Sequence, residues 1–426
     1  MRKMRDSGIE WIGDIPQDWK TDRLQWHLKE INVSNNPIQT KNILSLTIEA
    51  GVIPYAEKGN QGNKAKEDYS QYKIAFPDTL VINSMNVIIG AVGISQYFGC
   101  VSPVYYVFEP IEGTDLRYIY YLFTNTGFQK EMRKYAKGIL EIRLRISSND
   151  MLKRIVPSPP FKEQQRIADY LNKMCAEIDT VLEKTRASIE EYKKLKQAVI
   201  TQAVTKGIRG DRPMKDSGIE WIGDIPAEWK VNLIKNVATT GSGGTPESGN
   251  PSLYDGDINW ICSYDLKERP ITKSERRLTQ LGADSIAGNV QLKGSVLVAM
   301  YGGSGTIGNS GILECEAKTN QAICSIKFNN GYITDYFGFY YILSIRKYWM
   351  IFAVGTRKDP NISQDIVRKM PCILPPIAEQ EEIVAYCNKA CDQLDTLIAK
   401  KQQYLTEIEN YKKSLIYEYV TGKKEV

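Results

Sequence analysis

The stretch DSGIEWIGDIPQDWK at Asp6–Lys20 recurs as DSGIEWIGDIPAEWK at Asp216–Lys230, with two differences in fifteen positions. We call these two stretches the boxes. A second repeat follows each box, as PPFKEQ at Pro159–Gln164 and PPIAEQ at Pro375–Gln380. Repeats of this kind indicate a chain built from two equivalent halves. Between box and second repeat lie segments of about 21–155 and 231–370, which we call the inserts and which do not align with each other.

The bulk composition is that of a globular protein with a mild positive charge. The 426 residues are enough for two or three domains, and the net charge of +5 is compatible with nucleic acid. The first residues lack the apolar core of a signal peptide, and no apolar run approaches a membrane span. Eight cysteines without a Cys-x-x-Cys pair, and a single histidine, argue against structural zinc. We therefore expect a cytoplasmic protein with reduced thiols, no bound metal and no membrane association.

From the second repeat onward the halves align without a gap, and apolar residues alternate four and three positions apart. This 3.5-residue period is typical of coiled coils, so we expect two long helices that pair with each other. An approximate two-fold relating the halves makes that pair antiparallel. Gly207 and Gly422 suit the ends of the helices. The expected seam is Ile167, Leu171, Met174, Ile178, Val181, Thr185, Ser188, Tyr192, Leu195 and Val199, with Ile383, Cys387, Ala390, Leu394, Leu397, Lys401, Tyr404, Ile408, Tyr411 and Leu415; Leu182, Ile189, Ile200, Ile398, Leu405 and Ile416 widen it.

The inserts have the pattern of mixed α/β domains. Strands are expected at Thr79–Asn83 and Ser295–Ala299, and later ones at Val104–Phe108 and Ala322–Ile326. Helices are expected to start near Thr114-Asp115 and Thr334-Asp335, which are good N-caps. The expected fold class is α+β, with two mixed α/β domains joined by an antiparallel coiled coil and related by an internal pseudo-two-fold. The expected segments are a first domain at 1–157, a helix at 158–207, a second domain at 208–373 and a helix at 374–426.

The motifs that could carry catalysis are weak. Gly303–Gly308 matches the dinucleotide-binding glycine pattern, but a turn and a strand are expected after it where that site needs a helix. Ser158-Pro-Pro-Phe161 resembles the loop of amino-methyltransferases, yet Leu374–Ile377 in the second half lacks both its polar and its aromatic residue. The single histidine, His27, makes no catalytic triad persuasive. We expect a non-catalytic chain, and a self-contained DNA adenine methyltransferase stays as an alternative.

Three motifs together resemble those of a known family, the specificity subunits of type I restriction–modification systems. They are the two boxes, the Pro-Pro-x-x-Glu-Gln-x-x-Ile helix starts at Pro159–Ile167 and Pro375–Ile383, and the Val-Thr helix ends at Val204 and Val420. The resemblance implies that each insert is a target recognition domain that reads one half of a bipartite sequence in double-stranded DNA. It implies that the paired helices set the spacing between half-sites and dock two methyltransferase subunits, and that restriction subunits join the complex. S-adenosylmethionine, ATP and magnesium would then belong to partner subunits, with no cofactor in this chain.

Candidate DNA contacts are polar or basic residues near turns, since Lys and Arg neutralise phosphates while Arg, Asn and Gln read base edges. The candidates are Asn83, Met85, Asn86, Lys137, Arg143, Arg145, Ser242, Gly243, Gly244, Thr245, Ser304, Thr306, Lys318, Asn320, Gln321, Arg357 and Lys358. Further basic residues in the second insert are Lys267, Arg269, Lys273, Arg276 and Arg277.

The repeated segments are candidates for contacts with partner subunits, because equivalent partners need equivalent surfaces. The candidates are Trp11, Ile12, Trp221, Ile222, Glu163, Gln164, Glu379 and Gln380. The boxes could equally pack on the ends of the long helices. A coiled-coil scaffold that binds only protein, without DNA specificity, is a second alternative for the whole chain.

Overall fold

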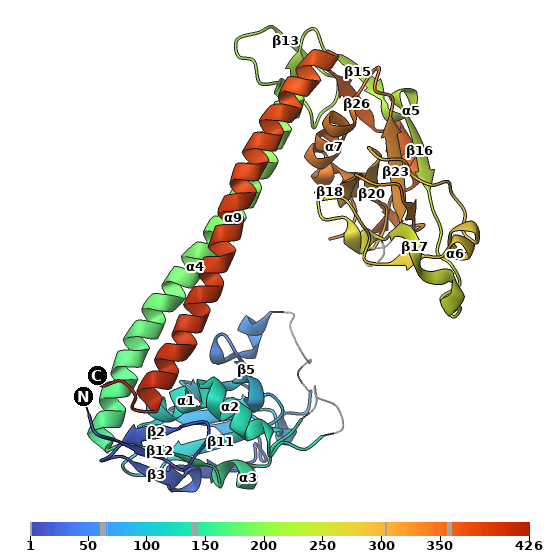
Figure 1. Ribbon diagram of the computed structural model, residues 1–426. Coiled ribbons are helices and arrows are strands. Elements are labelled where there is room, and N and C mark those ends of the chain that lie inside the picture. The colour runs from blue at the N-terminus through green and yellow to red at the C-terminus, as the bar shows by residue number, and fades with distance from the viewer. Residues whose placement is uncertain (1, 60–64, 66, 139–143, 303–304, 356–359) are drawn as a thin grey trace. The chain divides into compact units, whose positions relative to one another are not determined.

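The computed structural model describes residues 2–59, 65, 67–138, 144–302, 305–355 and 360–426. Internal contacts divide the chain into two compact units, Met1–Arg186 with Gln403–Val426, and Ala187–Gln402. We call these unit 1 and unit 2. Each unit contains one box, one insert and part of each long helix (Figure 1). Because unit 1 includes both 1–186 and 403–426, both ends of the chain belong to it.

The two boxes fold as the same hairpin. In unit 1, β1 (Met4–Asp6) pairs antiparallel with β2 (Asp14–Pro16), and in unit 2, β13 (Met214–Asp216) pairs with β14 (Asp224–Pro226) in the same register. The strand after each box pairs with the strand before each long helix. These pairs are β3 (Lys20–Arg23) with β12 (Ile155–Ser158), and β15 (Lys230–Leu233) with β26 (Pro371–Leu374). The start and the end of each insert are therefore joined at one place.

The insert of unit 1 is built on an antiparallel sheet of order β4-β11-β8-β9. The predicted strand at Thr79–Asn83 is β8, and α1 begins after Asp115, whose side chain caps the Arg117 amide. Residues of α1 and α2 pack with the sheet in one apolar core. The elements are β4 (Leu28–Ile31), β5 (Leu44–Thr47), β6 (Gly51–Pro54), β7 (Lys73–Ala75), β8 (Thr79–Asn83), β9 (Val92–Ser95), β10 (Gly99–Val101), β11 (Tyr105–Pro110), α1 (Leu116–Thr124), α2 (Thr126–Arg133) and α3 (Ser148–Leu152).

The insert of unit 2 has a different architecture, with a five-stranded sheet of order β16-β23-β20-β21-β18 and a smaller sheet of order β19-β17-β22. The described residues 305–313 after the first glycines form a turn and then β21, which pairs antiparallel with β20, so a strand follows here and no helix, as predicted. The elements are α5 (Ile234–Val237), β16 (Ala238–Ser242), β17 (Tyr254–Ile261), β18 (Pro270–Ile271), β19 (Arg277–Leu278), α6 (Gln280–Asp284), β20 (Val296–Ala299), β21 (Ser310–Leu313), β22 (Lys318–Thr319), β23 (Ile323–Phe328), α7 (Asp335–Ser344), β24 (Val354–Gly355), β25 (Pro360–Asn361) and α8 (Gln364–Lys369).

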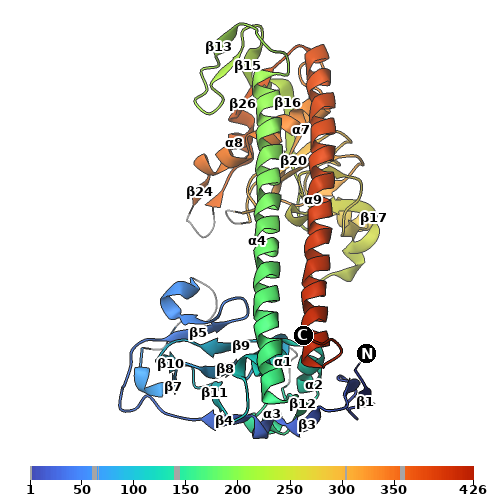
Figure 2. The same cartoon turned by 90° about the vertical axis from the view of Figure 1, so that its left-hand side faces the viewer.

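The two long helices, α4 (Phe161–Lys206) and α9 (Ile377–Val420), lie side by side and antiparallel (Figure 2). In unit 1, Asp179 pairs with Lys412 at 2.5 Å and Arg186 with Glu409 at 2.8 Å, so residue numbers fall along α9 as they rise along α4. Unit 2 repeats the pattern, with Lys196 bonded to Asp395 at 2.6 Å. Gly207 and Gly422 have positive φ angles at the helix ends, as expected.

The seam between the helices keeps Ile167, Leu171, Ile178 and Thr185 of the predicted period in α4, and at other positions uses residues that were predicted to widen it, together with Cys175 and Cys391. Cys175, Leu182 and Ile189 are buried in α4, where the periodicity favoured Met174, Val181 and Ser188. In α9 the shift is the same, toward Cys391, Ile398 and Leu405. The cause is that neighbouring residues such as Val181 and Leu182, or Leu397 and Ile398, are both apolar, and an apolar period alone cannot decide which of them faces the partner helix. Several predicted seam residues face away from the partner helix and are exposed, and we call them the exposed apolar column. They are Val181, Leu195, Leu397, Tyr404 and Tyr411.

Candidate nucleic-acid interface and its supporting frame

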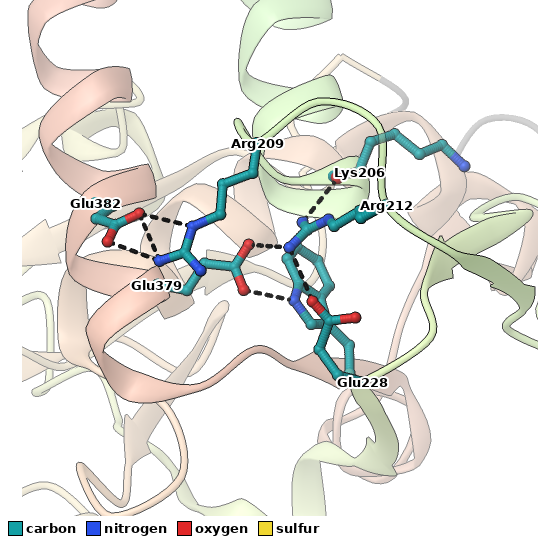
Figure 3. A network of polar contacts seen from close by, with 7 residues as sticks. Lys206, Arg209, Arg212, Glu228, Glu379 and Glu382 are labelled. Atoms are coloured by element: carbon teal, nitrogen blue, oxygen red, sulfur yellow. Dashed lines mark hydrogen bonds and ion pairs between the residues drawn. The ribbon is translucent and has the colours of Figure 1, made fainter.

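A buried carboxylate anchors the second box to the first turn of α9 (Figure 3). Glu379 is 2% exposed, and its Oε2 accepts a hydrogen bond from Trp229 Nε1 at 2.9 Å. Its Oε1 pairs with Arg212 at 2.5 Å, and Arg212 also reaches Glu228 at 3.1 Å. A second pair, Arg209–Glu382 at 2.7 Å, lies beside this network. The box is therefore held to the helix by charge-assisted hydrogen bonds within unit 2.

The first box has the same anchor. Trp19 Nε1 donates to Glu163 Oε2 at 3.0 Å, and Arg2 pairs with Glu163 and with Asp18. The Arg2 guanidinium lowers the pKa of the Asp18 carboxyl through their hydrogen bond. Arg2 and Arg212 are not among the predicted site residues, although they are separated by the same offset as the boxes, which is the signal in the sequence that could have found them.

The glutamine next to each carboxylate connects the long helix to the insert. Gln164 Oε1 accepts from the Asp115 amide at 2.9 Å, and Gln380 Oε1 accepts from the Thr334 amide at 2.8 Å. Asp115 and Thr334 are the N-cap residues of α1 and α7, and Thr334 makes no side-chain cap. Each insert is thus fixed to its long helix by a buried amide.

These contacts bear on the residues predicted to bind partner subunits. The polar atoms of Glu163, Gln164, Glu379 and Gln380 are bonded within the chain, and Ile12 and Ile222 are buried. Trp11 and Trp221 are partly exposed, and their rings pack on Phe128 at 5.4 Å and Tyr348 at 5.7 Å. The arrangement favours packing of the boxes on the helix starts, and only the tryptophans retain surface for a partner.

The end of each long helix closes onto a box through a lysine. Lys423, beyond α9, donates from Nζ to the Ile12 and Asp14 carbonyls of the first box, both at 2.9 Å. Lys206, at the end of α4, donates to the Ile222 carbonyl of the second box at 3.1 Å. Burial lowers the pKa of Lys423. The lysine after α9 thus makes with the first box the kind of contact that the lysine at the end of α4 makes with the second.

Two of the predicted DNA-contacting loops in unit 1 lie together. Asn83 is buried and accepts from the Met85 amide at 3.0 Å, so it shapes the turn that exposes Met85 and Asn86. Lys137 and Arg145 are exposed and joined by two backbone hydrogen bonds. The amide of the next residue, Ile146, donates to the Ser84 carbonyl at 3.2 Å, which places the Lys137–Arg145 pair beside the turn of Met85 and Asn86.

Three segments of unit 2 meet at Gln321, namely Ser242–Thr245, Tyr301 and Thr319–Gln321. The Gln321 carbonyl accepts from Tyr301 Oη at 2.6 Å and from Ser242 Oγ at 3.4 Å, and its side-chain Oε1 accepts from Thr245 Oγ1. The Gly244 amide donates to the Thr319 carbonyl at 3.0 Å. Gly243 passes so close to Thr319 that a Cβ would lie 1.7 Å from the Thr319 carbonyl oxygen, so this approach requires glycine. We call Ser242–Thr245 with Asn320 and Gln321 the Gln321 cluster.

Other candidates in unit 2 stand apart from this cluster. Lys318 is 8% exposed and donates from Nζ to the Gly288 carbonyl at 2.6 Å, so its ammonium group is bonded inside the fold. Thr306 is half-buried in the turn before Asn309 and makes no bond to the Gln321 cluster among the described residues. Arg143, Ser304, Arg357 and Lys358 lie outside the described residues.

The described residues contain no group of three or more His, Cys, Asp or Glu side chains that could hold a metal ion. None of the helices, over the residues the structure describes, is long and apolar enough to span a membrane. The segment Ser158–Phe161 is the end of β12 and the start of α4, where the Pro159 carbonyl accepts from Gln164 Nε2 at 2.9 Å. This proline motif therefore begins a helix.

With two equivalent frames carrying two different inserts, the fold is that of a duplicated recognition protein. The family described as "Type I restriction modification DNA specificity domain" matches twice, at residues 16–191 and 226–410. The chain belongs to this family. Its membership confirms the prediction of a non-catalytic specificity subunit of a type I restriction–modification system.

Individual relatives agree with this membership. A Methanocaldococcus jannaschii protein, provisionally named the specificity subunit of type I restriction enzyme MjaX, is 24% identical over 97% of this chain and 95% of its own length. The MjaVIII specificity subunit of the same organism is 25% identical over 72% of this chain and 70% of its own. A chain in a solved structure on "complex assembly and conformational transition of the type I R-M system" has a TM-score of 0.74 at 13% identity, covering 96% of this chain and 99% of that one. That likeness confirms the fold class.

Proposed function

We propose that each insert reads one half of a bipartite sequence in double-stranded DNA, and that the boxes and long helices form a common frame for the two readers. The observation that carries this proposal is the pairing of equal frames with unequal inserts. Trp19–Glu163 and Trp229–Glu379 are equivalent anchors, while the main insert sheets have four and five strands. Two different recognition domains held in the same way by equivalent frames suit two half-sites of different sequence.

The proposed recognition domains are residues 1–157 and 208–373, and the proposed frame helices are 158–207 and 374–426. In the first domain the reading surface is the pair of loops that holds Asn86 and Arg145. In the second it is the Gln321 cluster. Both surfaces present amide or guanidinium groups, which read base edges.

We further propose two methyltransferase subunits and restriction subunits as partners, which would bring S-adenosylmethionine, ATP and magnesium. The exposed apolar column of α4 and α9, together with Trp11 and Trp221, offers equivalent surfaces to two equivalent partners. We also propose the cytoplasm as the compartment, because the eight unpaired cysteines suit its reducing conditions.

Mapping methylated adenines in the host genome with this gene present and absent tests the proposal. The expected result is a two-part motif with a fixed spacer that disappears with the gene. Methyl transfer to DNA by the purified chain alone would instead identify a self-contained methyltransferase. An unchanged methylation map, with no sequence-dependent DNA binding by the chain and its partners, would leave only a protein-binding scaffold.

The paired helices are proposed to set the spacer. Inserting seven residues into both α4 and α9 in register preserves the seam and adds about 10 Å of helix, which corresponds to roughly three base pairs. The methylated motif should gain a longer spacer while its half-sites stay the same. A two-residue insertion is the control, because it rotates the seam by about 200° and should abolish methylation. An unchanged spacer after the seven-residue insertion would contradict a spacing role.

A further inference from the structure

A hollow of about 710 Å³ in unit 2 is formed by one continuous segment, which holds the further basic residues of the second insert. The segment runs from Asp265, the last residue of the short helix η7 (Ser263–Asp265), through β18 to the start of β19, and we call it the 265–277 segment. Its lining residues are Asp265, Lys267, Arg269, Pro270, Ile271, Thr272, Lys273, Ser274, Glu275 and Arg277.

The acidic side chains of this segment are bonded to groups other than Arg269, Lys273 and Arg277. Asp265 Oδ2 accepts from the Cys262 amide at 2.8 Å, and burial raises the pKa of this carboxyl. Glu268 forms an ion pair with Arg346, and Glu275 pairs with Lys267 at 3.4 Å. The three carboxylates therefore do not neutralise the remaining cations.

Three cations of the segment are left uncompensated. Arg269, Lys273 and Arg277 are exposed, and no ion pair or side-chain hydrogen bond joins them to any part of the chain that the structure describes. Arg276 lies over the Tyr264 ring, with its guanidinium carbon 6.0 Å from the ring centroid. The hollow is thus a concave surface with a local excess of positive charge, which attracts phosphate.

The 265–277 segment is coupled to the Gln321 cluster through strand β17. Ser274 Oγ accepts from the Trp260 amide at 3.1 Å, and the Ser274 amide donates to Asn259 Oδ1 at 3.2 Å. On the other side of β17, Asn320 donates from its amide to the Ile261 carbonyl at 3.0 Å. One strand (β17 in Figure 1) therefore fixes the distance between the basic hollow and the cluster proposed to read bases.

We infer that the hollow binds the sugar–phosphate backbone of the DNA whose bases the second insert reads, with Arg269, Lys273 and Arg277 as the phosphate-contacting residues. This inference rests on the proposed function. Three exposed cations spread across the hollow suit successive phosphates of a strand, since no cation there is buried enough to enclose one small anion. Such contacts position the reader and supply affinity, while base contacts supply specificity.

The test compares the salt dependence of DNA binding by the full chain in complex with its methyltransferase subunits. The variant carries Arg269→Gln, Lys273→Gln and Arg277→Gln. Plots of log affinity against log salt should become shallower by about 0.9 per lost phosphate contact, or up to about 2.7 in total. The loss should be equal on a duplex with the methylated motif and on an unrelated duplex of the same length, and the motif should not change.

The matched control changes three other exposed lysines of unit 2, Lys230→Gln, Lys235→Gln and Lys369→Gln, with the same change in net charge. A slope equal to that of the control would overturn the inference, as would a loss confined to the motif duplex. If circular dichroism shows that the triple variant is misfolded, the single variant Lys273→Gln replaces it in the same test. Its plot of log affinity against log salt should become shallower by about 0.9. Failure of the proposed function is distinguishable, because the unmodified complex would then fail to methylate any motif.

Discussion

The indole Nε1 of Trp229 lies 2.9 Å from Oε2 of Glu379, and this bond fixes the second box to the first turn of α9. The equivalent bond in the first half, between Trp19 and Glu163, is 3.0 Å long. An arginine from the segment preceding each box completes the anchor. The two halves thus share the same anchor between box and long helix, although their inserts differ.

Removing the carboxylate of this anchor should loosen one box without affecting the other. Glu379→Gln leaves Arg212, whose side chain is 11% exposed, without its buried partner, a change that typically costs about 3–5 kcal/mol. Hydrogen exchange of residues 214–230 should become faster by a factor of a hundred or more, roughly as that free energy requires. Glu163→Gln is the matched variant, and it should accelerate exchange in residues 4–20 instead.

A double variant separates the charge from the packing. Replacing Arg212 by Met in the Glu379→Gln chain removes the unpaired cation, so exchange should slow relative to the single variant. Equal exchange in the single and double variants would mean that the ion pair does not anchor the box.

The sequence alone predicts the boxes, the strands and the paired helices, but it does not predict which side chains contact each other. The boxes, the strands at Thr79–Asn83 and 295–299, and the antiparallel helices follow from repetition and periodicity. The seam register does not follow, because Val181 and Leu182 are both apolar and only the partner helix selects between them. The Gln321 cluster does not follow either. It joins Ser242, Tyr301 and Gln321, which are distant in the sequence and meet only through sheet topology.

The corrected register makes a prediction at two neighbouring positions. Leu182 is 5% exposed and Val181 is 39% exposed. Leu182→Ala should therefore reduce the free energy of unfolding of unit 1 by about 2–5 kcal/mol, and Val181→Ala by less than about 0.5 kcal/mol. Urea denaturation followed by circular dichroism measures both. A larger effect at Val181 would restore the register that the periodicity favoured.

His27, the only histidine of the chain, should make the stability of unit 1 depend on pH in a defined window. Its Nδ1 lies 3.1 Å from Thr114 Oγ1, its Nε2 is buried without a partner, and burial lowers the pKa of the imidazole despite the nearby Asp22. Above about pH 6.5 neither the folded nor the unfolded state binds the proton. Below it the unfolded state binds the proton first, so stability falls by up to about 1.4 kcal/mol per pH unit until the folded-state pKa is reached.

The variant His27→Asn, which can keep a polar atom toward Thr114, isolates this effect. Between pH 5 and 6.5 the carboxylates are largely ionised, so urea midpoints of the variant should be nearly flat across that window. Parallel slopes in the variant and the unmodified chain would show that protonation of His27 does not destabilise the fold.

Gln321 should determine one base pair of the half-site read by the second insert. Thr245 Oγ1 holds its Oε1, Tyr301 holds its carbonyl, and no described residue accepts a hydrogen bond from its Nε2. A held amide with a free donor suits an adenine or guanine edge, and such a contact is worth about 1–3 kcal/mol of discrimination. Gln321→Ala should therefore relax the methylated motif at one position of one half-site by roughly tenfold to a hundredfold, with the other half-site unchanged. Thr245→Val, which removes only the hydroxyl that orients the amide, should relax the same position less.

The control is Asn86→Ala in the first insert, which should affect the opposite half-site instead. If the motif stays intact in Gln321→Ala while overall methylation drops, Gln321 supports the loops and does not read a base.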